Sequence, residues 1–143
     1  MITLQQLSDN FQRFNANKAA DEIIMSNGNY AIDLTQGQMI RGRMPDGSII
    51  GTYRSPFYAE FKNLKNPLAG FGVVDLNFEG NYYKGMAFTG KYPNYKIIGR
   101  DGKTKSIEGK YGDPLGLDKT NFNLFRNKND KDFIEKKLKP LFK

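Results

Sequence analysis

The sequence predicts an α+β fold in which a long N-terminal helix and C-terminal helices pack on a small antiparallel sheet. Three observations lead to this fold class. An amphipathic helical pattern opens the chain, an alternating hairpin pattern lies beyond its middle, and helical spacing returns near the C-terminus. A length of 143 residues fits a single domain spanning 1–143.

The N-terminal pattern predicts one helix over residues 3–27. Thr3 is a suitable N-cap, and Gln6 stands three residues later, where the partner in a capping box belongs. Apolar residues then recur at spacings of three and four, which places on one face Leu4, Leu7, Phe11 and Phe14. Gly28 indicates the end of this helix, because Gly adopts the left-handed conformation that follows many helix C-termini.

A short helix and a turn are expected next. Residues 30–43 favour a helix capped by Asp33 or Thr35, although the Gly residues within it weaken its helical propensity. The segment 44–47 reads Met-Pro-Asp-Gly and predicts a turn. Pro restricts φ, Asp bonds to its own backbone, and Gly accepts a positive φ.

A second amphipathic helix is expected to begin at Ser55 and Pro56, an N-cap followed by the first helical position. It would end near residue 63, with apolar residues at spacings of four and three on one side: Phe57, Phe61 and Leu64. The Pro- and Gly-containing loop 66–72 that follows is the best candidate for a segment that orders on contact with a neighbour.

A β-hairpin is the strongest expectation for the centre of the chain. Residues 82–89 alternate in the manner of a strand, 90–94 contain Gly, Pro and Asn and form a turn, and 95–98 return as the second strand.

Helices are expected again after the hairpin. Residues 103–111 favour a short helix, and Asp118 is placed to cap a second. The polar run 127–130 predicts an interruption. A last helix then starts at about Asp130, with acidic residues first and Lys residues later, which suits the helix dipole.

The composition excludes several kinds of chemistry. The chain has no Cys, so disulfides, thiolate catalysis and most structural zinc sites are ruled out. It has no His, the usual acid–base group at neutral pH and the commonest metal ligand. No apolar run approaches the roughly 20 residues that a membrane helix needs, so no membrane partner is expected.

Carboxylates are the only remaining candidates for acid–base work, and four lie in the aromatic-rich part of the chain: Glu60, Asp75, Glu79 and Glu108. A hydrolase of the glycosidase type would need two of them across a cleft. No close pair stands out in the sequence, and no Ser has a His to activate it. We therefore expect no enzyme activity, no cofactor and no metal site, with a small hydrolase as the remaining enzymatic alternative.

The net charge of +7 comes entirely from the C-terminal third. Residues 1–90 carry eight basic and eight acidic residues, whereas residues 91–143 carry fourteen basic and seven acidic ones. A solvated basic face explains this imbalance as well as a surface that meets nucleic acid or an acidic protein.

Two segments of the chain, taken in their order along the sequence, resemble those of a known protein family. The first runs Gly-Thr-Tyr-Arg-Ser-Pro-Phe-Tyr-Ala-Glu-Phe-Lys over 51–62. The second has Val-Asp-Leu at 74–76 ahead of Gly80, then Tyr-Lys-Gly at 83–85, and Tyr-Gly follows at 111–112. This order resembles the tail-completion or neck proteins of tailed bacteriophages, the minor tail or head–tail connector subunits that close a tail tube or join it to the head.

The resemblance implies a structural virion protein that forms a homo-oligomeric ring and does no chemistry. Its partners would be copies of itself and other neck, portal or tail proteins, with non-specific passage of DNA, and it would be assembled in the host bacterial cytoplasm. Aromatic residues and Arg are enriched at interfaces. The candidate interface residues, if exposed, are Tyr53, Arg54, Phe57, Tyr58, Phe71, Tyr82 and Tyr83. We expect Tyr to be more exposed than Phe.

A basic nucleic-acid-binding module is the alternative function. Aromatic residues interleave with Lys in residues 91–143, and such rings can stack on bases while Lys follows the phosphates. In a ring that passes DNA, basic residues clustered around the hairpin would face the lumen. The candidate DNA-facing residues are Lys96, Arg100, Lys103 and Lys105.

Overall fold

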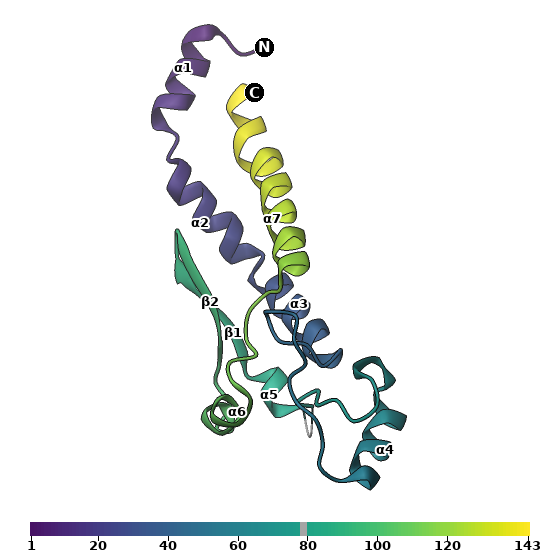
Figure 1. The fold of residues 1–143 in the computed structure, drawn as a ribbon. Coiled ribbons are helices and arrows are strands. Elements are labelled where there is room, and N and C mark those ends of the chain that lie inside the picture. Colours follow the sequence, from purple (N-terminus) through teal and green to yellow (C-terminus); the bar gives the residue numbers. More distant parts are fainter. Residues whose placement is uncertain (78–79) are drawn as a thin grey trace.

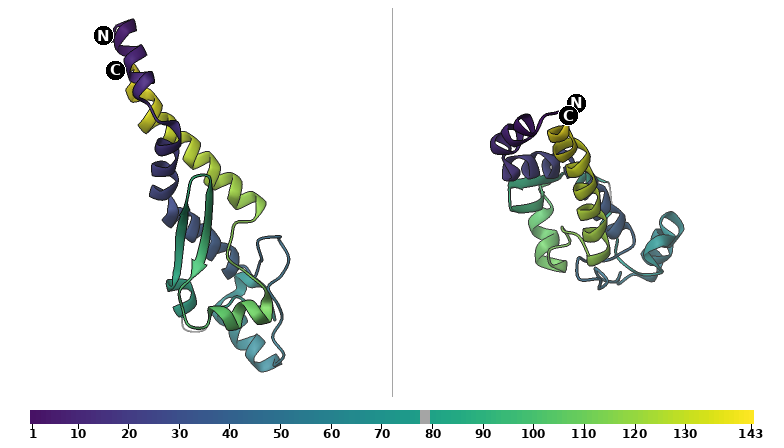
Figure 2. Two further views of the ribbon diagram at one scale, coloured as in Figure 1. Left: turned by 90° about the vertical axis from the view of Figure 1, so that its left-hand side faces the viewer. Right: turned by 90° about the horizontal axis from the view of Figure 1, so that it is seen from above.

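The computed structural model describes residues 1–77 and 80–143 and shows an elongated molecule (Figure 1). The two chain termini lie together at one end, and helix α4 (Pro56–Lys65) lies at the opposite end. The two further views in Figure 2 show the same arrangement of the termini. The end that carries the termini and the end that carries α4 therefore lie far apart in the molecule.

The expected long N-terminal helix over residues 3–27 is wrong, because two shorter helices replace it: α1 (Leu4–Arg13) and α2 (Ala16–Ser26). The short helix expected over 30–43 is present as α3 (Gly28–Ile40). The capping box of Thr3 and Gln6 is present as expected. Phe14 has an extended backbone, and the Asn15 side chain accepts a hydrogen bond from the N–H of Lys18 and so caps α2. Asn15 therefore starts a new helix within the apolar pattern.

The expected end at Gly28 is correct for α2, yet α3 begins at that same residue. Gly28 allows β1 (Met86–Lys91) to approach α3, since a Cβ there would lie 2.9 Å from Cδ1 of Phe88. The caps proposed at Asp33 and Thr35 are wrong, because both lie inside α3.

The start of α4 follows the prediction. The Ser55 side chain accepts a hydrogen bond from the N–H of Tyr58, and Pro56 occupies the first turn. The helix ends at Lys65, and a short 3₁₀ turn, η1 (Pro67–Ala69), follows it. The turn over 44–47 is also present, with a positive φ of 87° at Gly47 and a bridge between Arg43 and Ile49.

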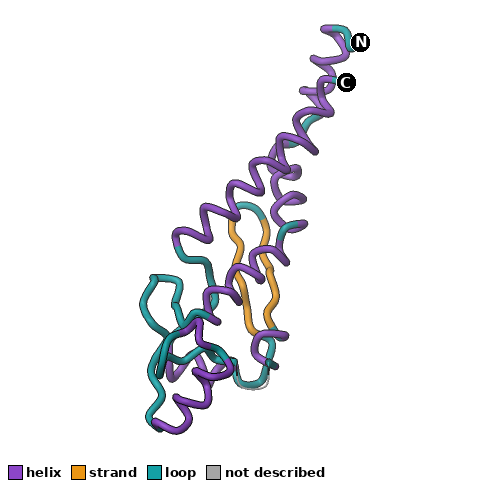
Figure 3. The backbone as a smooth tube through the Cα atoms, turned by 90° about the vertical axis from the view of Figure 1, so that its right-hand side faces the viewer, coloured by secondary structure: helices purple, strands orange, loops and turns teal. Residues whose placement is uncertain are grey.

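The hairpin is confirmed, but its first strand begins later than expected. Residues Asn81–Lys84 form α5, and β1 then pairs antiparallel with β2 (Asn94–Gly99). The register runs from Met86 opposite Gly99 to Lys91 opposite Asn94. Figure 3 shows the two strands lying along the helices, and β1 contacts both α2 and α3.

The C-terminal helices are more continuous than expected. Helix α6 covers Thr104–Tyr111, and α7 runs through Lys119–Phe133 after its cap at Asp118. The interruption proposed at 127–130 is wrong, since α7 runs through these residues and packs on α2 and α3, with Asn129 accepting a hydrogen bond from Asn27 at the junction of those helices. A π-helical turn, η2 (Ile134–Leu138), and a 3₁₀ turn, η3 (Lys139–Phe142), complete the chain.

The main core lies where α3, α5, α6 and the segment around residue 75 meet. Its buried members are Met39, Ile50, Val74, Leu76, Tyr82, Tyr83, Met86, Ile107 and Leu115. A second group of aromatic contacts joins α7 to the hairpin, where the ring of Phe125 lies 5.8 Å from Phe88 and 6.5 Å from Tyr30. Helices thus pack on a small antiparallel sheet, which confirms the α+β class.

Candidate protein-interaction surface

Large apolar side chains lie exposed along α4 and the turn after it. We call this set the α4 stripe. The exposed fractions are 84% for Phe57, 48% for Phe61, 80% for Leu64, 64% for Leu68 and 65% for Phe71. The spacing of Phe57, Phe61 and Leu64 is that of one helical face, whereas Leu68 lies in η1 and Phe71 in the turn after it.

The burial of α4 is reversed relative to an ordinary amphipathic helix. Its buried residues are Ala59 and Lys62, whereas Phe57 and Leu64 face solvent. Burial of a large apolar side chain is worth roughly 1.5–3 kcal/mol. The chain alone forgoes this stabilisation along the α4 stripe.

A buried carboxylate holds α4 in this orientation. Asp75 is 2% exposed, and its Oδ1 lies 2.8 Å from Nζ of Lys62. Its Oδ2 accepts a hydrogen bond of 2.8 Å from Nδ2 of Asn66, directly after α4. The backbone N–H of Asn77 and the hydroxyl of Tyr53 also donate to Oδ1, at 3.0 and 3.4 Å. Four donors thus converge on one carboxylate beneath the helix.

The same groups connect α4 to the core. Lys62 also donates to the carbonyl of Asn77, and Asn66 donates to the carbonyl of Ile40 at the end of α3. Tyr83 donates its hydroxyl to the carbonyl of Asp75 at 2.5 Å. The polar network therefore fixes α4 against α3 and the core without using large apolar side chains of α4.

Electrostatics favour the ionised form of Asp75. Burial opposes ionisation, but the hydrogen bonds from Lys62, Asn66 and the Asn77 N–H outweigh it, so the pKa of Asp75 is lowered. Burial raises the pKa of Tyr53 and of Tyr83, so both hydroxyls stay protonated as donors. The arrangement suits a structural anchor whose carboxylate oxygens are already occupied.

The other candidate carboxylates do not join this site. Glu60 is exposed on α4, Glu108 is exposed on α6, and Glu79 lies outside the described residues. Across residues 1–77 and 80–143, no cluster of three or more acidic side chains is arranged to hold a metal ion.

The structure gathers five of the seven candidate interface residues around α4: Tyr53, Arg54, Phe57, Tyr58 and Phe71. The ring of Tyr58 meets the ring of Tyr53 edge to face at 5.0 Å and stacks on the ring of Phe61 at 6.1 Å. Tyr82 and Tyr83 are instead buried, at 4% and 8% exposure. Their assignment as exposed anchors is wrong, because α5 turns both rings into the core.

The expectation that Tyr would be more exposed than Phe is also wrong at this site. Phe57 and Phe71 are exposed, whereas Tyr53 and Tyr58 are half-buried against one another. Sequence reasoning did not assign Phe61, Leu64 and Leu68 to the interface. The signal for Phe61 and Leu64 was their shared face with Phe57, but periodicity does not say whether a face is buried or exposed.

The four candidate DNA-facing residues are exposed but not gathered on one surface. Lys96 and Lys105 line one hollow, which also contains Asp101, Glu108 and Asp113. Arg100 lines a different hollow beside the start of α3. The clustering around the hairpin in sequence therefore becomes a region of mixed charge in space.

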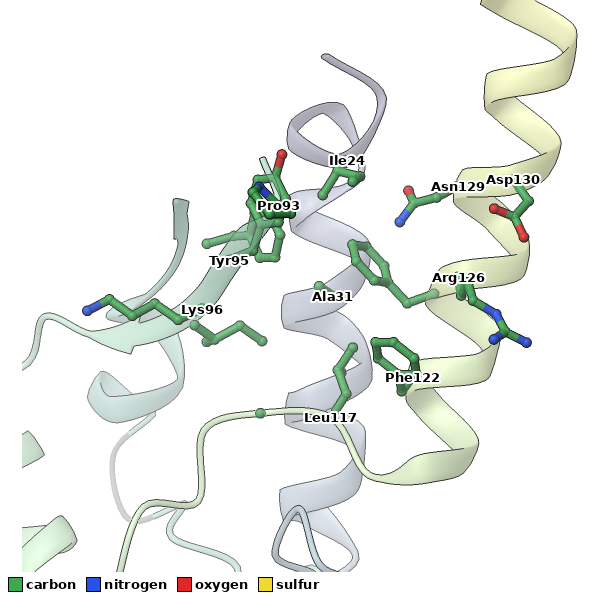
Figure 4. A pocket seen from close by; sticks show the side chains of 14 residues that line it. Ile24, Ala31, Pro93, Tyr95, Lys96, Leu117, Phe122, Arg126, Asn129 and Asp130 are labelled. Atoms are coloured by element: carbon green, nitrogen blue, oxygen red, sulfur yellow. The ribbon is translucent and has the colours of Figure 1, made fainter. Parts of the chain in front are cut away.

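A further hollow of about 410 Å³ lies between the hairpin, α3 and α7. Figure 4 shows Leu117 and Phe122 pointing toward Ala31 across it. Phe88 and Ile97 supply its hairpin wall, so the lining is mainly apolar, with Lys96 and Arg126 at its margin. We call it the hairpin hollow.

Comparison with protein-family models, with curated protein sequences and with solved structures gives no match. In the part of the chain that the structure describes, no helix combines the length and the apolar character needed to cross a lipid bilayer.

Proposed function

We propose that this chain is a non-catalytic structural subunit that self-associates through the α4 stripe. The observation that carries the proposal is the reversed burial of α4, which exposes Phe57 and Leu64 and buries Lys62. A polar network holds that face outward, so its exposure is built into the folded chain.

The size of the α4 stripe supports an interface. The exposed parts of its three Phe side chains equal nearly two whole rings, or about 300–500 Å² before the two Leu residues are added. That is already comparable to the largest apolar patch on a typical monomer. It is also about half of what each partner contributes to a standard protein interface.

A ring needs two different patches that meet head to tail. The α4 stripe and the hairpin hollow are two such patches on separate elements of the chain. We therefore propose that the α4 stripe of one copy packs into the hairpin hollow of the next. Recognition of this kind, an apolar helix face seated in an apolar groove, is common among protein complexes.

The biological setting of the proposal comes from the sequence resemblance to phage tail-completion and neck proteins. In that setting the ring joins or completes head and tail of the virion, next to other neck, portal or tail proteins, after assembly in the bacterial host.

The first test is the oligomeric state of the double variant Phe57→Ser/Leu64→Ser, measured by analytical ultracentrifugation. The matched control is Leu4→Ser/Leu124→Ser, which removes two exposed helical apolar residues outside both patches. We expect the wild type and the control to form oligomers, seen as rings by electron microscopy, and the stripe variant to remain monomeric. A wild-type protein that is monomeric at all concentrations would contradict the proposal.

A mixing experiment tests the head-to-tail geometry. Phe122→Asp alters the hairpin hollow at a residue that is 52% exposed. Each variant alone should be monomeric, but the stripe variant and the hollow variant together should form one-to-one dimers through the intact patch of each. A mixture that stays monomeric contradicts pairing between these two patches.

A further inference from the structure

A second groove, of about 780 Å³, lies at the end of the molecule opposite α4. It runs between the junction of α1 with α2 and the C-terminal turns η2 and η3. One acidic side chain, that of Glu22, lines it together with five basic ones: Arg13, Lys18, Lys136, Lys137 and Lys143. We call it the basic groove.

The walls of the basic groove are held together by contacts between the two chain ends. Nδ2 of Asn10 donates to the carbonyl of Leu141 at 2.9 Å. The rings of Phe11 and Phe142 meet edge to face at 5.6 Å. Figures 1 and 2 show these two helical ends side by side. The cations therefore stand on a defined scaffold and not on loose tails.

Two irregularities in the helices shape this groove. On one side, the break between α1 and α2 puts Phe14 and Asn15 into its lining. On the other side, the helix widens into the π-helical turn η2, which carries Lys136 and Lys137. Turns of this type occur frequently at functional sites.

One of the five cations in the groove forms a direct ion pair, and the carboxylates of Glu22, Asp132 and Glu135 act at longer range on Lys18, Lys136 and Lys143. Glu22 forms an ion pair with Lys137. Within residues 1–77 and 80–143, no ion pair involves Arg13, Lys18, Lys136 or Lys143. Four cations without a bound carboxylate thus share one hollow, whereas the hollow beside Lys96 and Lys105 contains three carboxylates.

We propose that the basic groove binds the phosphodiester backbone of nucleic acid without reading its sequence. Neutralisation of phosphates by Lys and Arg is sufficient for such binding. Phe14, which lines the groove, packs against the ring of Phe133, 6.2 Å away, so the groove presents its cations more than this ring. An acidic peptide is the alternative occupant, and the competition experiment below separates the two. This proposal does not depend on self-association through the α4 stripe.

The test compares two variants that remove the same charges, one Arg and three Lys each. The groove variant is Arg13→Gln/Lys18→Gln/Lys136→Gln/Lys143→Gln. The control is Lys96→Gln/Arg100→Gln/Lys103→Gln/Lys105→Gln, which changes the basic residues around the hairpin. Binding of a fluorescent 20-base-pair DNA duplex is measured by anisotropy over a series of salt concentrations, and circular dichroism checks that each variant is folded.

Four phosphate contacts predict that wild-type affinity falls about 100-fold between 50 and 200 mM salt. We expect the groove variant to lose about 100-fold in affinity at 50 mM salt together with most of this salt dependence, while the control stays within about threefold of the wild type. The duplex is also titrated with Phe57→Ser/Leu64→Ser, which should retain binding per chain if the groove acts alone.

Three outcomes overturn the proposal. Equal losses in the two charge variants mean that only the net charge matters. A larger loss in the control places the contact at the hairpin. Competition by poly-glutamate as effective as that by unlabelled DNA, at equal charge, means that the groove takes an acidic protein and not nucleic acid.

Discussion

Different kinds of interaction hold the helices in place at the two ends of this molecule. At the α4 end a buried ion pair and amide hydrogen bonds hold the helix, and the apolar side chains face outward. At the end near the termini, aromatic rings hold the helices together, and the charged side chains face a hollow. At the α4 end, polar interactions hold the helix and apolar side chains face solvent. At the other end, aromatic contacts hold the helices and charged side chains face solvent.

This difference has a physical reason. The exposed apolar side chains of α4 do not contribute to packing within their own chain, so other interactions hold α4 in place. A buried ion pair provides orientation because its geometry is directional, although desolvation offsets much of its attraction. At the basic groove, aromatic rings, the hydrogen bond from Asn10 and the ion pair of Glu22 with Lys137 join the two chain ends, and the other Lys residues remain hydrated and accessible.

Among the substitutions that test this difference between the two ends, Asp75→Ala should cause the largest loss in the free energy of unfolding. It removes the acceptor from Lys62, Asn66 and Tyr53 together, and loss of one partner from a buried ion pair costs about 3–5 kcal/mol. Chemical denaturation measures this cost. Asp130→Ala, at an exposed position of α7, is the control and should change stability by less than about 0.5 kcal/mol. Equal small effects would show that the network does not anchor α4.

Acid should remove part of the same stabilisation. Because the folded state lowers the pKa of Asp75, its contribution is complete above the ordinary pKa of about 3.9 and disappears as pH falls through the lower folded value. Denaturation curves from pH 7 to pH 2 should therefore show a loss of stability below about pH 4. In Asp75→Asn, which has no carboxylate to protonate at this position, the loss of stability below this pH should be smaller. An unchanged pH profile in this variant would contradict the assignment.

Phe142→Ala should act at the other end and by less. It removes an edge-to-face contact with Phe11 between two rings that are each about half exposed, so we expect a loss of about 1 kcal/mol. Amide hydrogen exchange should be faster in α1 and η3 but unchanged in α4. Faster exchange at both ends would mean that they unfold as one unit.

Loss of a helix cap should have an effect of similar size to Phe142→Ala, but a more local one. Ser55→Ala and Thr3→Ala each remove a side-chain acceptor at a helix start, worth about 1 kcal/mol locally. Ser55 caps a helix tied to the core, so its loss should lower global stability. Thr3 caps an exposed terminal helix, and its loss should appear only as fraying in hydrogen exchange.

Much of the local structure could be predicted from the sequence. The caps at Thr3, Ser55 and Asp118, the hairpin and the turn before Ile49 all occur as expected. The break at Asn15 was missed, although Asn is a favourable N-cap, because the apolar periodicity continues across it. In the opposite direction, the polar run within α7 predicted a break that packing on α2 and α3 overrides.

By itself, the amino-acid sequence determined the α+β class, the helix starts at Thr3, Ser55 and Asp118, and the excess of positive charge in the C-terminal third. These features depend on residue composition or on groups within about four positions of one another. Only the tertiary structure decided that the Phe face of α4 points outward and that Arg13 and Lys18 join C-terminal Lys residues in one groove. Both depend on which distant segment covers a helix face, and helical periodicity carries no information about that partner.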